Sequence, residues 1–184
     1  LVAATEHAGL KYEDWNLHIY DETLSDEFLD AARRIKAHNP NIRIFSDKAE
    51  PNPERMRQFA SVVDYWCPLV PTLNDTQYDS SYAVMRESGH PIMMYLCEPT
   101  PTSSLAEYRL MPWRAWHYGL QGFGYWAFLP NRQRQQDAAP NYGFFYQDSE
   151  GFSPSRRWLE WENGIDDYRL LETAARYSPQ GRQM

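Results

Sequence analysis

The sequence has no excess of basic charge and no long apolar run. Its 18 Lys and Arg residues are outnumbered by 25 Asp and Glu residues, which gives a net charge of −7 at pH 7. A surface that follows the phosphates of a nucleic acid needs clustered positive charge, so we expect no nucleic-acid partner. No apolar run approaches the roughly 18 residues of a membrane-spanning helix, so we also expect no membrane span.

Cysteine is scarce as well. The chain has two, Cys67 and Cys97, which is too few for a disulfide framework or for a zinc site of four clustered ligands. We predict two buried thiols at the ends of strands, and a bridge between them only in an oxidising compartment. The first residues, Leu1 to Leu10, lack the basic start and the long apolar stretch of a signal peptide.

The sequence does contain an alternation of short apolar runs with longer helical patterns. Repeated βα units predict a parallel sheet, either in a barrel or in a doubly wound open sheet. No Gly-rich phosphate loop follows any run, which disfavours the nucleotide-binding open sheets. We expect neither a cofactor nor a metal. The runs are near-continuous, as in strands covered on both faces, and comprise residues 17–20, 42–45, 62–66, 92–97 and 123–128.

Helix start signals lie between these runs. They combine Ser or Asn caps with Pro or acidic residues in the first turn. Pro112 is expected to split the fourth helix, because proline cannot donate a backbone hydrogen bond. The predicted starts are Ser25, Asn52 with Pro53, the segment before Tyr82 and Met85, Ser104 with Glu107, and Ser153 with Pro154.

Carboxylates and aromatic rings follow the predicted strands. In barrels and open α/β sheets, functional residues gather at the C-terminal ends of strands. A core seldom buries unpaired Asp or Glu, whereas a sugar-cleaving site needs both carboxylates and rings. These strand-end residues are Tyr20, Asp21 and Glu22; Ser46 and Asp47; Trp66 and Cys67; Tyr95 and Glu98; and Tyr125, Trp126 and Phe128.

The neighbours Asp21 and Glu22 are the candidate catalytic pair. Adjacent residues on a strand point to opposite faces, so both serve one site only if the strand ends and the chain turns there. Ordinary glycosidase carboxylates flank the scissile bond, about 5 to 10 Å apart. Adjacent carboxylates suit a different division, in which one protonates the leaving oxygen and the other orients a 2-acetamido group of the substrate. The alternative is a solvated turn with acids near a helix N-terminus.

Three stretches of the chain resemble glycoside hydrolase family 123 and its uncharacterised relatives. Leu17-His-Ile-Tyr-Asp-Glu22 resembles the catalytic motif on their fourth strand. The segment from Arg109 to Gly119, followed by Gln121-Gly-Phe-Gly-Tyr-Trp126, resembles their seventh helix and eighth strand. Ser155-Arg-Arg-Trp and Glu162-Asn-Gly-Ile-Asp-Asp-Tyr168 resemble their final helix. The chain departs from the pattern at Thr23 and Gln147, where the relatives often have Pro.

The resemblance implies a fold, an activity and a location. The fold would be the C-terminal part of a (β/α)₈ TIM barrel, with residues 1–184 supplying strands four to eight. The activity would be that of a retaining N-acetyl-β-galactosaminidase acting by substrate-assisted catalysis on a glycan that contains N-acetylhexosamine. Glu22 would be the general acid/base and Asp21 would stabilise an oxazolinium-like intermediate. The relatives imply a secreted or periplasmic location, and we expect the 184-residue chain alone to be inactive.

Two alternatives stay open. One is a non-catalytic carbohydrate-binding or scaffold domain. The other is a barrel glycosidase with two separated carboxylates, for which Asp47 or Glu98 would be the second. For the leading hypothesis, a β-N-acetylhexosaminidase, the predicted substrate-binding residues are Tyr20, Trp66, Tyr95, Tyr125 and Trp126.

Overall fold

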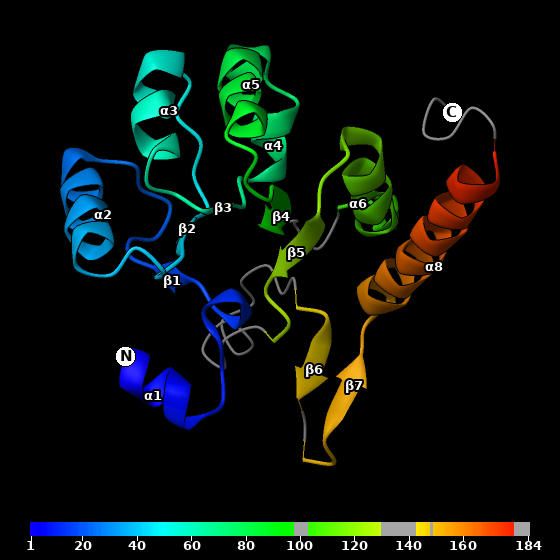
Figure 1. Ribbon diagram of the computed structural model, residues 1–184. Coiled ribbons are helices and arrows are strands. Elements are labelled where there is room, and N and C mark those ends of the chain that lie inside the picture. Colours follow the sequence, from blue (N-terminus) through cyan, green and yellow to red (C-terminus); the bar gives the residue numbers. More distant parts are fainter. Residues whose placement is uncertain (98–102, 130–142, 148, 179–184) are drawn as a thin grey trace. The chain divides into compact units, whose positions relative to one another are not determined.

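The computed structural model describes residues 1–97, 103–129, 143–147 and 149–178. The chain divides into two compact units, Leu1–Met94 and Tyr95–Met184. Figure 1 labels the helices and strands of both units.

Unit 1 alternates strands with helices. It also contains two short 3₁₀ helices, η1 and η2, and its last strand, β4, continues into unit 2. Its elements are α1 (Val2–His7), η1 (Tyr12–Asp14), β1 (Leu17–His18), α2 (Asp26–His38), β2 (Ile44–Ser46), α3 (Pro53–Ala60), β3 (Tyr65–Trp66), α4 (Val70–Leu73), η2 (Thr76–Tyr78), α5 (Asp79–Glu87) and β4 (Met93–Cys97).

Helices α2 and α3 begin where their caps predict. The Ser25 hydroxyl accepts a hydrogen bond from the Phe28 amide, and the Asn52 side chain accepts one from Arg55. Each cap satisfies a backbone N–H that has no partner inside the helix.

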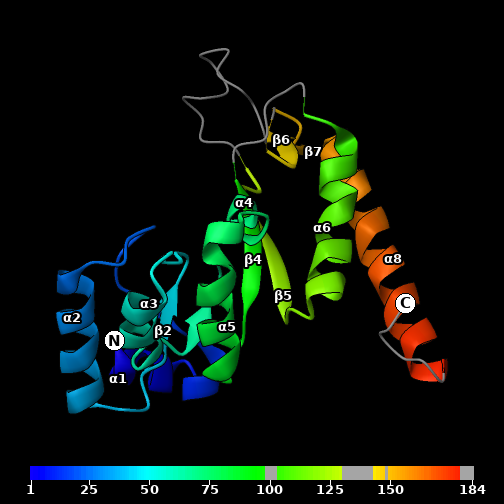
Figure 2. The same cartoon turned by 90° about the horizontal axis from the view of Figure 1, so that it is seen from above.

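A parallel three-stranded sheet, in the order β1-β2-β3, forms the centre of unit 1. His18 pairs with Phe45, and Ser46 pairs with Trp66. Helices α2, α3 and α5 run along one side of these strands (Figure 1, Figure 2). The core of the unit consists of fully or almost fully buried side chains, with Phe28, Leu29, Ile44, Met56, Phe59, Trp66 and Met85 as its large members.

The described residues of unit 2 form two helices, the end of β4, one further strand and a hairpin. Helices α6 (Leu105–Tyr118) and α8 (Arg156–Tyr177) pack against each other. Strand β5 (Gly122–Trp126) pairs with β4, and β6 (Phe145–Gln147) forms an antiparallel pair with β7 (Phe152–Pro154). An aromatic cluster fills this unit and includes Tyr108, Phe123, Tyr125, Phe144, Trp158 and Trp161.

The contact between α6 and α8 combines close packing with a polar clamp. The Arg109 guanidinium donates two hydrogen bonds to the Asp167 carboxylate, at 2.7 and 3.0 Å, and the Trp113 indole N–H donates a third at 2.9 Å. Gly164 is buried on α8, and a Cβ at this position would lie 2.5 Å from the Arg109 carbonyl oxygen. The two helix backbones therefore approach closely at Gly164, beside the clamp.

The predicted fold, strands four to eight of a TIM barrel, is wrong. The strands form three separate sheets of two or three strands, parallel and antiparallel, and none is closed. Each expected apolar run does contain a strand, but β1 and β3 have only two residues each. After β3 the parallel ladder is reduced to an isolated bridge between Trp66 and Ile92. The strands that follow β5 along the chain, β6 and β7, form an antiparallel hairpin. Closure of a barrel requires a continuous ladder of paired strands, which these short pairings do not supply.

Two helix predictions also need correction. Pro112 does not split its helix, because α6 runs through it without a break. The last helix begins at Arg156 with Ser155 as its cap, whereas Ser153 and Pro154 belong to β7. In the described parts of the chain, no helix combines the length and the apolar character that a membrane crossing requires.

We expect Gly164→Ala to destabilise the protein. The new methyl group would clash with the Arg109 carbonyl, and overpacking of this kind costs about 1–3 kcal/mol. The gain in helix propensity of about 1 kcal/mol does not offset a clash with rigid backbone. Urea unfolding measures the difference. Asn163→Ala, at the exposed neighbouring position, is the matched control and should be neutral or stabilising; an equal gain for Gly164→Ala would contradict the close approach.

We expect the Arg109–Asp167 clamp to lose its effect in acid. The Arg109 hydrogen bonds, with that from Trp113, hold the pKa of Asp167 below its ordinary value. A lowered folded-state pKa gives stability that is present above the unfolded pKa of about 3.9 and is lost as pH falls through the folded pKa. Asp167→Asn should therefore be less stable than the parent at pH 7. The difference in the free energy of unfolding should disappear below about pH 4.

Unfolding curves from pH 2 to pH 7 test this expectation. Asp166→Asn is the matched control, because Asp166 forms an exposed pair with Arg169 on α8, and exposed pairs contribute little. A stability difference between Asp167→Asn and the parent that does not change with pH would contradict the role of the carboxylate charge.

Candidate functional site

Asp21 and Glu22 lie in a bend directly after β1. The strand ends at His18, residues 20–22 bend, and α2 begins at Asp26. Glu22 has a positive φ of 44°, the one non-glycine residue with this conformation in the described chain. The turn that the adjacent carboxylates need is therefore present. Both side chains are exposed to solvent.

Asp47 fixes the backbone of this bend. It follows β2, the strand next to β1, and its Oδ1 accepts a hydrogen bond of 3.0 Å from the Glu22 amide. Within the bend, the Thr23 hydroxyl donates to the Asp21 carbonyl at 2.9 Å. The first bond connects the segments that follow β1 and β2, the second lies within the bend, and together they support the left-handed conformation of Glu22.

His18 also contacts Asp47. Its Nε2 lies 3.4 Å from Asp47 Oδ2, and its ring meets that of Phe45 edge-on. The pairing of His18 with Phe45 explains the contact, because Asp47 lies two residues after Phe45, directly past the end of β2. His18 is not a core residue, since 39% of its side chain is exposed.

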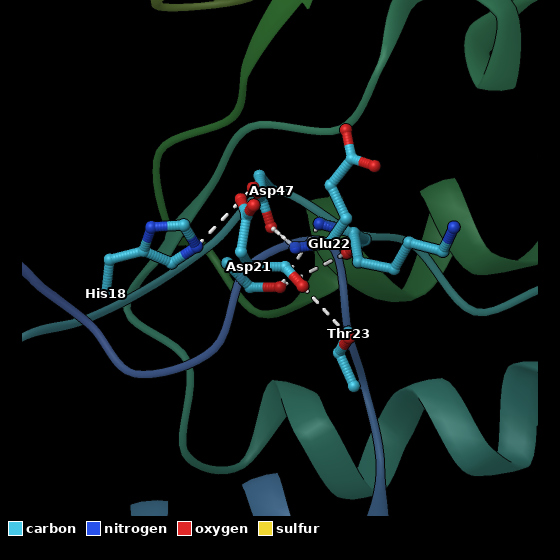
Figure 3. A network of polar contacts seen from close by, with 7 residues as sticks. His18, Asp21, Glu22, Thr23 and Asp47 are labelled. Atoms are coloured by element: carbon cyan, nitrogen blue, oxygen red, sulfur yellow. Dashed lines mark hydrogen bonds and ion pairs between the residues drawn. The ribbon is translucent and has the colours of Figure 1, made fainter.

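Burial and neighbouring groups shift the pKa of Asp47. Asp47 is buried, and this burial raises the pKa of its carboxyl, as does a hydrogen bond with the Asp21 side chain; His18 and the Glu22 amide act in the opposite direction. Among the ion pairs of the described residues, no Lys or Arg pairs with Asp21 or Asp47. Figure 3 shows His18 and Asp47 turned toward each other, while the carboxyl of Glu22 points away from them.

Cys67 is not suited to be a nucleophile. Its thiol is buried after β3, and burial together with the charge of nearby Asp47 raises its pKa to about 12. A thiol reacts as the thiolate, which is a negligible fraction of Cys67 at neutral pH. The structure has Cys67 and Cys97 as free thiols, the first buried and the second half-buried.

The predicted substrate-binding rings do not all belong to unit 1. Tyr20 lies beside the carboxylate pair and is 41% exposed. Trp66 is fully buried in the core, so in this conformation it offers no surface to a ligand. Tyr95, Tyr125 and Trp126 belong to unit 2. Unit 1 therefore brings together Tyr20 and the two carboxylates, and sugar contacts by the other rings stay predictions.

The rings of unit 2 differ in exposure. Tyr125 stacks on Phe144 with ring centroids 4.0 Å apart and is part of the aromatic cluster. Trp126 follows it on β5 and is 63% exposed. Of the two candidates for a separated second carboxylate, Asp47 contacts the Glu22 backbone, and Glu98 lies outside the described residues.

Comparisons with known proteins identify no family for this arrangement. No protein-family model matches the chain, and a search of curated proteins gives no significant match. The resemblance to glycoside hydrolase family 123 therefore stays a prediction.

The sequence predicts the position of Asp21 and Glu22 after a strand, and the structure confirms that position. The sequence also predicts Asp47 as a strand-end acid, but not its contacts with His18 and with the Glu22 backbone. The available signal was the order of the strands: in a parallel pair, residues after β1 and after β2 meet at one edge. The shift of register that aligns His18 with Phe45 could not be read from the sequence.

We expect the conformation of Glu22 to be strained. A left-handed conformation costs an L-residue roughly 1–2 kcal/mol relative to glycine, so Glu22→Gly should be more stable than Glu22→Ala by about 1 kcal/mol. At Thr23, where φ is not positive, the order should reverse, with the Gly variant less stable than the Ala variant by about 0.4–1 kcal/mol. Thermal or urea unfolding of the four variants tests this; the same order at both positions would contradict a strained bend.

Proposed function

We propose that the protein is a glycosidase, namely a retaining β-N-acetylhexosaminidase that uses the 2-acetamido group of its substrate as the nucleophile. The proposal combines the sequence resemblance with one observation, the bend at residues 20–22 that is held by Asp47. A regular strand would send adjacent carboxylates to opposite faces. The bend removes that constraint and leaves both exposed.

Glu22 is the proposed general acid/base. Its protonated carboxyl gives a proton to the glycosidic oxygen while the acetamido carbonyl oxygen attacks C1, so the C1–O bond to the leaving group breaks as the new C1–O bond forms. The resulting carboxylate of Glu22 then takes a proton from water, which attacks C1 and restores the acetamido group. Two displacements at C1 give retention of configuration.

Asp21 is the proposed partner of the acetamido group. Its carboxylate accepts a hydrogen bond from the N–H of the acetamido group and so orients the carbonyl oxygen toward C1. It also stabilises the positive charge of the oxazolinium-like intermediate. The bond from Thr23 to the Asp21 carbonyl holds the Asp21 backbone, and the hydrogen bond between the Asp21 and Asp47 carboxyls restricts the position of the side chain. Such support from neighbouring groups is what a positioning role requires.

Hydrolysis of matched aryl glycosides tests the proposal in protein expressed from its complete coding sequence. We expect cleavage of an aryl N-acetyl-β-galactosaminide but not of the corresponding galactoside. Glu22→Gln should lose about 10²–10⁴-fold in rate, and the loss should grow as the leaving group becomes more basic. Asp21→Asn should lose activity to a similar extent for every leaving group, because it acts on the acetamido side.

The control and the opposing outcomes are distinct. Glu6→Gln changes an exposed acid on α1 and should keep full activity. Cleavage of the plain galactoside alone would eliminate the acetamido mechanism and favour two separated carboxylates. Binding of N-acetylgalactosamine glycans without any cleavage would favour the carbohydrate-binding alternative. Full activity of Glu22→Gln would refute the assignment of the acid.

A further inference from the structure

Three potential metal ligands converge at the ends of β1 and β2. His18 offers an imidazole nitrogen, and Asp21 and Asp47 each offer a carboxylate oxygen; these three atoms lie within 4.8 Å of one another. The set therefore combines nitrogen and oxygen donors from two chain segments, which distinguishes it from a patch of surface acids.

The two carboxylates of the set have no Lys or Arg partner among the described residues. Asp47 is buried and contacts Asp21, so two carboxylates share a small space. Like charges at this separation repel, and buried charges are normally paired or coordinate a metal. Apart from His18, these two carboxylates have no cationic partner in the described part of the chain, and a metal ion would supply one.

The geometry of His18 and Asp47 suits coordination better than a hydrogen bond. The 3.4 Å between Nε2 and Oδ2 exceeds the usual 2.7–3.2 Å of an N–H···O bond. It is close to the separation of two ligands bound at about 2.0–2.2 Å to one tetrahedral ion. The Glu22 amide binds the other oxygen, Oδ1, and so orients the Asp47 carboxylate with Oδ2 toward His18. Backbone support of this kind is typical of metal-binding carboxylates.

We propose that His18, Asp21 and Asp47 bind a divalent transition-metal ion such as Zn²⁺. One imidazole and two carboxylates suit Zn²⁺ or Mn²⁺, whereas Ca²⁺ and Mg²⁺ prefer oxygen ligands alone. Three protein ligands leave a coordination position open to water or to an external ligand. The site departs from the sequence-based expectation of no metal. It does not depend on the proposed glycosidase activity, because the test measures metal binding directly.

Titration of the metal-free 184-residue chain with Zn²⁺ tests the site, by calorimetry and by competition with a chromogenic chelator. We expect one equivalent to bind, with a rise in melting temperature. His18→Ala, Asp21→Asn and Asp47→Asn should each weaken binding at least tenfold. Ca²⁺ and Mg²⁺ should bind much more weakly than Zn²⁺.

Co²⁺ supplies a second readout that separates this site from the cysteines. Bound by nitrogen and oxygen, Co²⁺ gives visible d–d bands without the near-ultraviolet charge-transfer band of a thiolate ligand. His38→Ala removes an exposed imidazole at the end of α2 and is the matched control; it should bind like the parent.

The outcomes decide the matter even if one variant fails to fold. Circular dichroism and melting of the metal-free variants identify a variant that fails to fold. The His18 side chain is exposed, so we expect His18→Ala to fold. Unchanged Zn²⁺ affinity in folded His18→Ala or Asp21→Asn would overturn the proposal, as would a thiolate band with Co²⁺ or no saturable binding to the parent chain.

Discussion

The hydrogen bond from the Glu22 amide to the Asp47 carboxylate joins the ends of β1 and β2, and the geometry of the candidate site depends on it. β1 pairs over only two residues, so the strand ladder by itself constrains the following bend little. The bond supplies that constraint and offsets part of the cost of the positive φ at Glu22. It also determines which oxygen of Asp47 faces His18. One interaction thereby sets the backbone of one acid and the orientation of another.

Local features of the fold were predictable because their causes are local. Ser25 and Asn52 cap the helices that the sequence predicts after them, because a cap requires only a side chain and the amide three residues later. The prediction of a barrel was wrong because closure depends on the length and register of pairings between distant segments, which local sequence patterns do not determine. Pro112 shows the same limit at smaller scale, since packing of α6 on α8 holds the helix together where local propensity predicts a break.

Some features of the candidate site could likewise be predicted from the sequence, and others depend on the register of distant segments. Asp21 and Glu22 follow an apolar run immediately before a helix cap, so their place at a strand end could be read from the sequence. Whether His18 faces Asp47 depends on the register of β1 against β2, and a shift of one residue would turn His18 to the other face. The burial of Trp66 depends on register in the same way, because a shift of one residue against β2 would turn its side chain to the other face.

The two proposals make competing demands on Asp21. An acetamido group needs its carboxylate as an acceptor, and a bound metal needs the same oxygens as ligands. Glu22, whose carboxyl points away from His18 and Asp47 (Figure 3), is left outside the metal set. Metal-bound and sugar-bound states are then mutually exclusive, and by linkage each ligand weakens the other by the same factor. A transition metal would accordingly act as an inhibitor competitive with substrate, and it would do so through Asp21 without touching the acid itself.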